Sequence, residues 1–128
     1  MSGKGEVGLI RDFRDLRIWQ EAMELVVMVY SITRRFPREE QYVLSAQLRR
    51  SALSVPSNIA EGNARRGRRE YLQFLGIASG SLAELRTQVE VAIRLGYISR
   101  EASVEAVALT ERIGRRLTAL RQRLLGTS

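Results

Sequence analysis

Residues 71–93 read YLQFLGIASGSLAELRTQVEVAI, and this stretch decides the fold class. Apolar side chains recur in it at intervals of three and four residues, which is the period of one face of an α-helix. The positions on this face are Tyr71, Phe74, Leu75, Ala78, Leu82, Leu85, Val89 and Ile93. No part of the chain alternates with the two-residue period of a strand over a useful length, so the sequence predicts an all-α protein.

Three more segments with helical period surround this stretch, and the apolar face of the last one comprises Leu109, Ile113, Leu117, Leu120 and Leu124. Pro37 ends the first segment, because the residue before a proline disfavours helical geometry. Gly67 and Gly96 suit left-handed caps, and Ser99 suits the N-cap of the last segment. The sequence therefore predicts an up-and-down four-helix bundle over residues 12–125 after a flexible tail of residues 1–11, with helices at about 15–36, 39–66, 69–95 and 100–125.

The second segment contains Pro56, which cannot donate a backbone hydrogen bond, so we predict a kink in this helix. Four polar residues lie beside the apolar positions of the same segment: Arg49, Arg50, Asn58 and Glu61. We predict that they form a structural polar cluster near the kink, as an ion pair or a subunit contact. The alternative is a polar site, but no second carboxylate, nucleophile or metal-ligand set accompanies Glu61.

The composition excludes several classes of function. The chain has 128 residues, a length typical of one domain, and it contains neither Cys nor His. Disulfides, thiolate nucleophiles and zinc fingers are therefore impossible, and the commonest general base is missing. We predict no catalytic residues, no metal and no cofactor. The longest apolar run, residues 25–32, is too short to span a bilayer, and no secretory signal is visible, so we expect a cytoplasmic protein without a membrane partner.

The charge points to an anionic partner. The net charge is +7, and Lys4 is the only lysine among 21 basic residues. The planar fork of arginine suits bidentate phosphate contacts, although a GC-rich genome would enrich arginine as well. Two clusters stand out, and their predicted nucleic-acid-binding residues are Arg65, Arg66, Arg68 and Arg69 at the second junction, and Arg112, Arg115, Arg116 and Arg123 in the last segment. The alternatives are a solvated basic turn and arginines that favour the helix dipole.

Self-association is predicted from a surplus of apolar faces. In the first segment, we assign one stripe to the core: Leu16, Trp19, Met23, Val26, Val27 and Tyr30. The nearly opposite stripe, together with small residues of the third segment, is predicted to form an oligomer interface: Ile18, Leu25, Val29, Ile32, Gly76, Gly80 and Ala83. The alternative is that these helices are simply buried more deeply in a compact bundle.

Several motifs resemble one known family along nearly the whole chain. They include Phe13-Arg14-Asp15-Leu16, the run SVPSNIAEG at residues 54–62, and Leu95-Gly96-Tyr97-Ile98. These motifs look like those of the bacterial four-helix-bundle proteins, also called intervening-sequence proteins of the large-subunit ribosomal RNA gene. Arg86 departs from the pattern, since the family commonly carries an acidic residue there.

The resemblance implies an up-and-down bundle that assembles into a ring, commonly a pentamer. It also implies distant kinship with accessory proteins of diversity-generating retroelements, which bind nucleic acid and a reverse transcriptase. No catalytic residues are transferred by it. Our interpretation is a non-enzymatic homo-oligomer that binds RNA or DNA backbones through arginines, with RNA as the first candidate. The alternative is a protein-binding scaffold whose charge is not used for nucleic acid.

Overall fold

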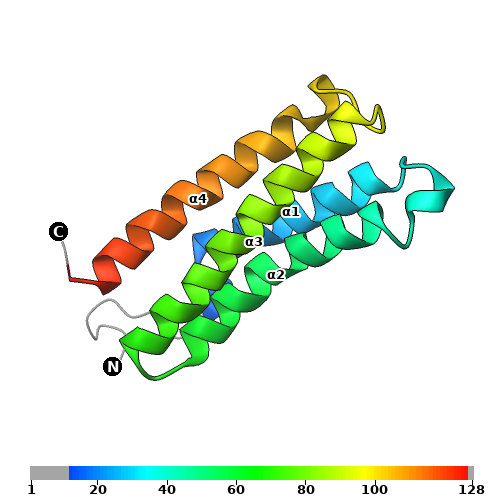
Figure 1. Ribbon diagram of the computed structural model, residues 1–128. Helices are drawn as coiled ribbons and strands as arrows, with labels where there is room; N and C mark the ends of the chain where they lie inside the picture. Colours follow the sequence, from blue (N-terminus) through cyan, green and yellow to red (C-terminus); the bar gives the residue numbers. More distant parts are fainter. Residues whose placement is uncertain (1–11, 127–128) are drawn as a thin grey trace.

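The computed structural model describes residues 12–126, and the tail of residues 1–11 lies outside this range. Four long helices and three short 3-10 turns make up the described chain, which contains no strand (Figure 1). The prediction of an all-α four-helix bundle is confirmed. In chain order the elements are η2 (Phe13–Asp15), α1 (Arg17–Thr33), η3 (Arg38–Glu40), α2 (Leu44–Ala64), α3 (Arg68–Arg94), η4 (Glu101–Ser103) and α4 (Val104–Leu124).

Each helix packs against its neighbours in the sequence, and α1 also packs against α4. The contact between α2 and α3 is the most extensive in the bundle. Figure 1 shows the C-terminal end of α4 at the same end of the bundle as the connection from α2 to α3. The connections from α1 to α2 and from α3 to α4 lie at the opposite end. This up-and-down order therefore brings together parts of the chain that are far apart in the sequence.

The core confirms the apolar faces predicted for α3 and α4. On α3 the side chains of Leu75 and Leu85 are fully buried, and on α4 Leu109, Ile113 and Leu117 are buried to at least 99%. Towards the ends of the two faces, Tyr71 and Leu124 are partly buried and pack against the same core.

The assignment of the two stripes on α1 is wrong in part, although Val26 of the predicted core stripe does lie in the core. Ile18, Leu25 and Val29, predicted to form an oligomer interface, are 5%, 0% and 2% exposed and lie in the core of the bundle. Met23 and Val27, predicted to face the core, are 39% and 67% exposed. The stripe with Leu25 therefore holds the bundle together and is not available to a second chain.

Two residues without large apolar side chains explain this error. Ala22 and Thr33 are fully buried and extend the Leu25 face along α1. The Thr33 hydroxyl can be buried because it donates to the carbonyl of Val29 at 2.8 Å. Neither residue is large and apolar, so a stripe defined by large apolar residues leaves both out. Burial of a hydroxyl whose hydrogen bond is satisfied costs little free energy.

The helix ends agree with the sequence in some places only. Gly96 has a φ of +81°, which confirms the left-handed cap after α3. Ser99 accepts a hydrogen bond from the backbone N–H of Ala102 at 3.0 Å, so it caps the turn that leads into α4. The second helix begins at Leu44, later than the predicted residue 39. Glu40 lies in the separate turn η3, where its carboxylate accepts from the Leu44 N–H at 3.3 Å.

Helix α2 continues through Pro56 as a single α-helix, and the kink stays a prediction. One turn N-terminal to Asn58, the carbonyl of Ser54 accepts a hydrogen bond from the Asn58 side chain at 2.7 Å. Among the described residues, no helix is long and apolar enough to cross a membrane.

Candidate nucleic-acid interface

The connection between α2 and α3 is short, extended and exposed. Arg65 has a φ of −77° and a ψ of 155°, and Gly67 has a φ of −98° and a ψ of 145°. The prediction of a left-handed cap at Gly67 is therefore wrong, because the chain passes to α3 through extended backbone. This extended connection leaves the arginine side chains on the outside of the turn.

Gly62 allows the two helices to approach closely just before this connection. A methyl group on Gly62 would lie 2.9 Å from Tyr71 Cδ1, 3.0 Å from Phe74 Cβ and 3.3 Å from the Tyr71 carbonyl oxygen. Only glycine fits at such distances. The close approach places the end of α2 directly against the first turns of α3 and so determines where the basic connection lies.

The four junction arginines divide into one that is bound to the bundle and three that are not. Arg65 forms an ion pair with Glu61, and its guanidinium lies 5.0 Å from the centre of the Phe74 ring. Arg66, Arg68 and Arg69 are exposed and form no ion pair with any described residue. Arg68 and Arg69 also stand in the first turn of α3, where positive charge opposes the helix dipole. An anion at this position would relieve that repulsion.

The arginines predicted on α4 also divide. Arg112 Nε and Arg116 Nε donate to the two carboxylate oxygens of Glu21 on α1, at 3.2 and 2.7 Å. Glu21 is only 13% exposed, so these two arginines tie α4 to α1. Arg115 lines an open groove between α3 and α4 instead. Arg123 is exposed, and no ion pair joins it to a residue that the structure describes.

Arg123 lies close to the first turns of α3. Burial raises the pKa of Tyr71, while a hydrogen bond from Asn63 at 3.3 Å and the positive charge of Arg123 act in the opposite direction. Arg121 extends over α3 as well, because its Nη2 would be 3.9 Å from a methyl group on Gly76. Of the residues predicted on α4, only Arg123 lies near the α2–α3 connection, and Arg121 accompanies it. We call the surface that comprises Arg66, Arg68, Arg69, Arg121 and Arg123 the basic end.

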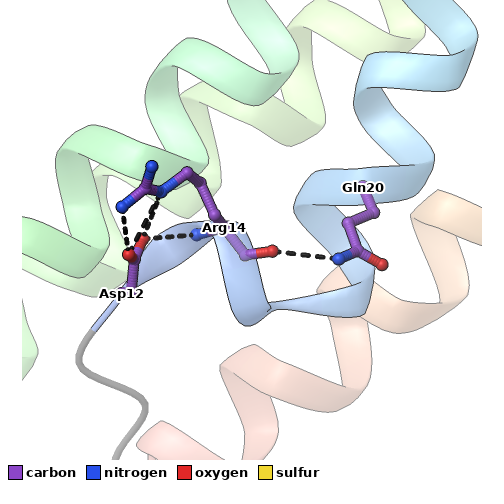
Figure 2. A network of polar contacts seen from close by, with 3 residues as sticks. All are labelled: Asp12, Arg14 and Gln20. Atoms are coloured by element: carbon purple, nitrogen blue, oxygen red, sulfur yellow. Dashed lines mark hydrogen bonds and ion pairs between the residues drawn. The ribbon is translucent and has the colours of Figure 1, made fainter.

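The turn before α1 contributes no free cation to this surface. Figure 2 shows Arg14 bound to Asp12 through its backbone N–H and its guanidinium, with distances of 2.5 to 3.1 Å. These contacts lower the pKa of Asp12 to about 2. Gln20 of α1 donates to the carbonyl of Arg14 at 3.0 Å and so attaches the turn to the helix. By contrast, Arg17 is exposed and forms no ion pair within residues 12–126; the sequence reasoning missed it because it stands alone at the start of α1.

Comparison with known proteins identifies the family. The profile of the family described as 23S rRNA-intervening sequence protein matches residues 14–119. The chain belongs to this family. A crystal structure of a protein of unknown function from the S23 ribosomal protein family of Bacteroides thetaiotaomicron has a similar fold, with a TM-score of 0.74. Its sequence is 24% identical, and the alignment covers 82% of this chain and 98% of that one. No curated protein matches the chain.

The family match includes only part of the basic end. It contains the junction arginines Arg66, Arg68 and Arg69, but it stops before Arg121 and Arg123. Arg86 lies 3.5 Å from a carboxylate oxygen of Glu111 on α4 and so provides a contact between α3 and α4.

The predicted polar cluster on α2 does not form. Arg49 donates to the Thr33 hydroxyl at 2.8 Å, and its guanidinium lies 4.6 Å from the centre of the Tyr30 ring on α1. The four residues have separate surroundings: Arg49 faces α1, Asn58 bonds to its own helix, Glu61 pairs with Arg65, and Arg50 lies at a shallow groove between α2 and α3. Arg49 faces α1, away from the other three residues, and Arg50 lies two to three turns before Asn58 and Glu61 along α2, so the four residues do not meet in one site.

The predicted interface residues other than Ile18, Leu25 and Val29 are more accessible. Ile32 and Gly76 are half-buried, and Gly80 and Ala83 are exposed on α3. No atom lies within 4 Å of the position that a methyl group on Gly80 would take. Gly80 is therefore not needed for packing inside the bundle. Within residues 12–126, no group of three or more acidic, His or Cys side chains could hold a metal ion.

Proposed function

We propose that this chain is a non-catalytic, self-associating bundle of the cytoplasm that binds RNA phosphates through its basic end. The observation that carries the proposal is the meeting of unpaired arginines from two distant parts of the chain. Arg66, Arg68 and Arg69 come from the α2–α3 connection, and Arg123 comes from the last turn of α4.

The chemistry of this surface suits a phosphate backbone. Guanidinium groups form bidentate hydrogen bonds to phosphate, and the free N–H groups of the first turn of α3 point in the same direction. Bound phosphate would also offset the unfavourable placement of Arg68 and Arg69 at the positive end of the helix dipole. Binding of this kind depends on the backbone, not on base sequence, and weakens as salt rises.

Self-association is part of the same proposal, and the outer side of α3 supports it. Ile77 is 48% exposed there, and the small residues Gly80 and Ala83 are exposed on the same helix. A second copy that packs on this face would build towards the ring, commonly a pentamer, that the resemblance implies. Each copy would then present its basic end, and weak phosphate contacts would add.

The test is binding of labelled generic RNA and DNA across a salt series. The variant Arg66→Ala/Arg68→Ala/Arg69→Ala removes three cations from the basic end. If each arginine contacts one phosphate, the slope of log affinity against log salt falls by about 2 units on single strands, since each contact contributes about 0.7. The matched control replaces the three exposed arginines at the opposite end of the bundle, Arg34, Arg35 and Arg38, with Ala.

The control variant loses the same net charge, so it separates local contacts from general attraction. We expect its salt slope to match that of the wild type. An equal loss of slope in both variants would show that charge alone acts at long range. Wild-type protein that associates but binds neither nucleic acid at low salt would contradict the proposal. The remaining function would then be a scaffold for a protein partner, such as the reverse transcriptase that the resemblance implies.

A further inference from the structure

A small groove lies where the start of α1 meets the last turns of α4. Its volume is about 230 Å³. Its apolar lining consists of Leu16, Ile18, Ala119 and Leu120, and the charged groups of its lining are Arg17, Arg116 and Arg123. Drug-sized ligands occupy pockets of roughly 300–1,000 Å³, so this groove has room for a single flat ring system and little more.

The arginines around the groove differ in how they are held. Arg17 and Arg123 are exposed and have no ion-pair partner in the described part of the chain, so their charges are available to an anion. The Nε of Arg116 donates to Glu21 at 2.7 Å, while 36% of its side chain remains exposed. Glu21 therefore holds the Arg116 guanidinium in one orientation at the groove. A guanidinium plane is a surface on which a nucleobase stacks.

The groove is continuous with the basic end because Arg123 belongs to both. On one side Arg123 borders the groove, and on the other its charge acts on Tyr71 in the first turns of α3. Arg68 and Arg69 precede Tyr71 in the same turns. A single phosphate backbone that binds along the basic end therefore also reaches the groove at Arg123.

We propose that the groove receives one unpaired nucleobase, while Arg17 and Arg123 contact the phosphates on either side of it. This inference rests on the proposed function and adds a substrate class to it, which is single-stranded RNA. A base inside a duplex is paired and stacked on its neighbours and does not reach such a groove. Arg123 lies beyond residue 119, where the family match ends.

The test compares three RNA probes of equal length: a short oligoadenylate, the same strand without bases, and a duplex. The variant Ala119→Leu enlarges the apolar lining of the groove without a change of charge or a loss of helix propensity. The matched control is Ala108→Leu, an exposed position about three turns away on nearly the same face of α4. Far-ultraviolet circular dichroism checks that both variants keep the helix content of the wild type.

We expect the wild type to bind oligoadenylate about five- to tenfold more tightly than the abasic strand, which is the size of one stacked base. Ala119→Leu should lose this difference and leave the affinity for abasic strand and duplex unchanged, whereas Ala108→Leu should retain it. Equal wild-type affinity for oligoadenylate and the abasic strand would overturn the inference and leave the proposed function intact. Wild-type protein that binds none of the three probes would overturn the proposed function itself. If Ala119→Leu unfolds, equal wild-type affinity for the two strands still overturns the inference, because that comparison needs no variant.

Discussion

Replacement of Gly62 with Ala tests the close approach that positions the basic end. In an unobstructed helix interior, Gly→Ala raises stability by about 0.5–1 kcal/mol. At Gly62 the new methyl group would meet Tyr71 and Phe74 at 2.9–3.3 Å. Two of the three nearest atoms are a carbonyl oxygen and a Cβ, which move only with the backbone of α3. We therefore place the overpacking cost near the upper end of its usual range, at about 3 kcal/mol.

The expected net effect of Gly62→Ala is a loss of about 2 kcal/mol in the free energy of unfolding. For a domain of this size that lowers the melting temperature by about 8 °C. Urea and thermal unfolding followed by circular dichroism measure both quantities. The matched control is Gly114→Ala in α4, where no atom lies within 4 Å of the new methyl group. We expect this variant to gain about 0.5–1 kcal/mol.

The two variants therefore shift stability in opposite directions. If Gly62→Ala proved as stable as Gly114→Ala, α2 and α3 would not be in close contact at this point. The position assigned to the basic connection would then be wrong as well. This outcome would refute the reasoning even if nucleic-acid binding were observed.

Three further predictions concern self-association, the α1–α4 contact and acid stability. Gly80→Ala should stabilise the isolated chain by about 0.5–1 kcal/mol but weaken self-association in sedimentation experiments; unchanged association would move the interface elsewhere. Glu21→Gln should lower the free energy of unfolding in urea by about 1 kcal/mol, since it releases two partly exposed arginines of α4, and an unaltered urea midpoint would show that this pairing contributes nothing. The pKa of Glu90 is lowered to about 2 from 4.5, chiefly by Arg100 and then by Arg94. The contribution of ionised Glu90 to the free energy of unfolding is present above about pH 4.5 and is lost as the pH falls towards 2. Glu90→Gln should therefore lose less stability than the wild type over that range, as measured by urea unfolding at each pH.

The regular parts of the fold could be predicted from local pattern. The faces of α3 and α4 repeat large apolar residues at helical spacing, so their directions were predicted correctly from Leu75 to Leu117. The cap at Gly96 was also predictable, because the left-handed backbone there depends on the one residue that lacks a side chain. At Gly67 the presence of glycine did not indicate a left-handed cap, because the backbone there is extended.

The orientation of α1 was not predictable in the same way. Both of its stripes are apolar, and the one that is buried depends on where α2 and α4 lie. The buried stripe includes Thr33, whose hydroxyl is satisfied by its own helix. A polar residue satisfied in this way carries no sign of burial in a hydropathy pattern.

The candidate site shows a similar division. The surplus of arginine at the α2–α3 connection is visible in the sequence, but the state of each arginine is not. Glu21 lies 91 and 95 residues before the arginines that it neutralises, so no spacing rule connects them. Arg17 is isolated in the sequence and acquires a place in the candidate site only because α1 starts beside the end of α4.

The sequence by itself determined the helical class, the apolar faces of α3 and α4 and the excess of positive charge. These properties depend on residues within about one helical turn of each other, or on composition alone. Tertiary structure decided which face of α1 is buried, which arginines remain unpaired and which distant segments form the basic end. Burial and ion pairing depend on distances between side chains that come together only when the chain folds. Separation along the sequence does not determine those distances.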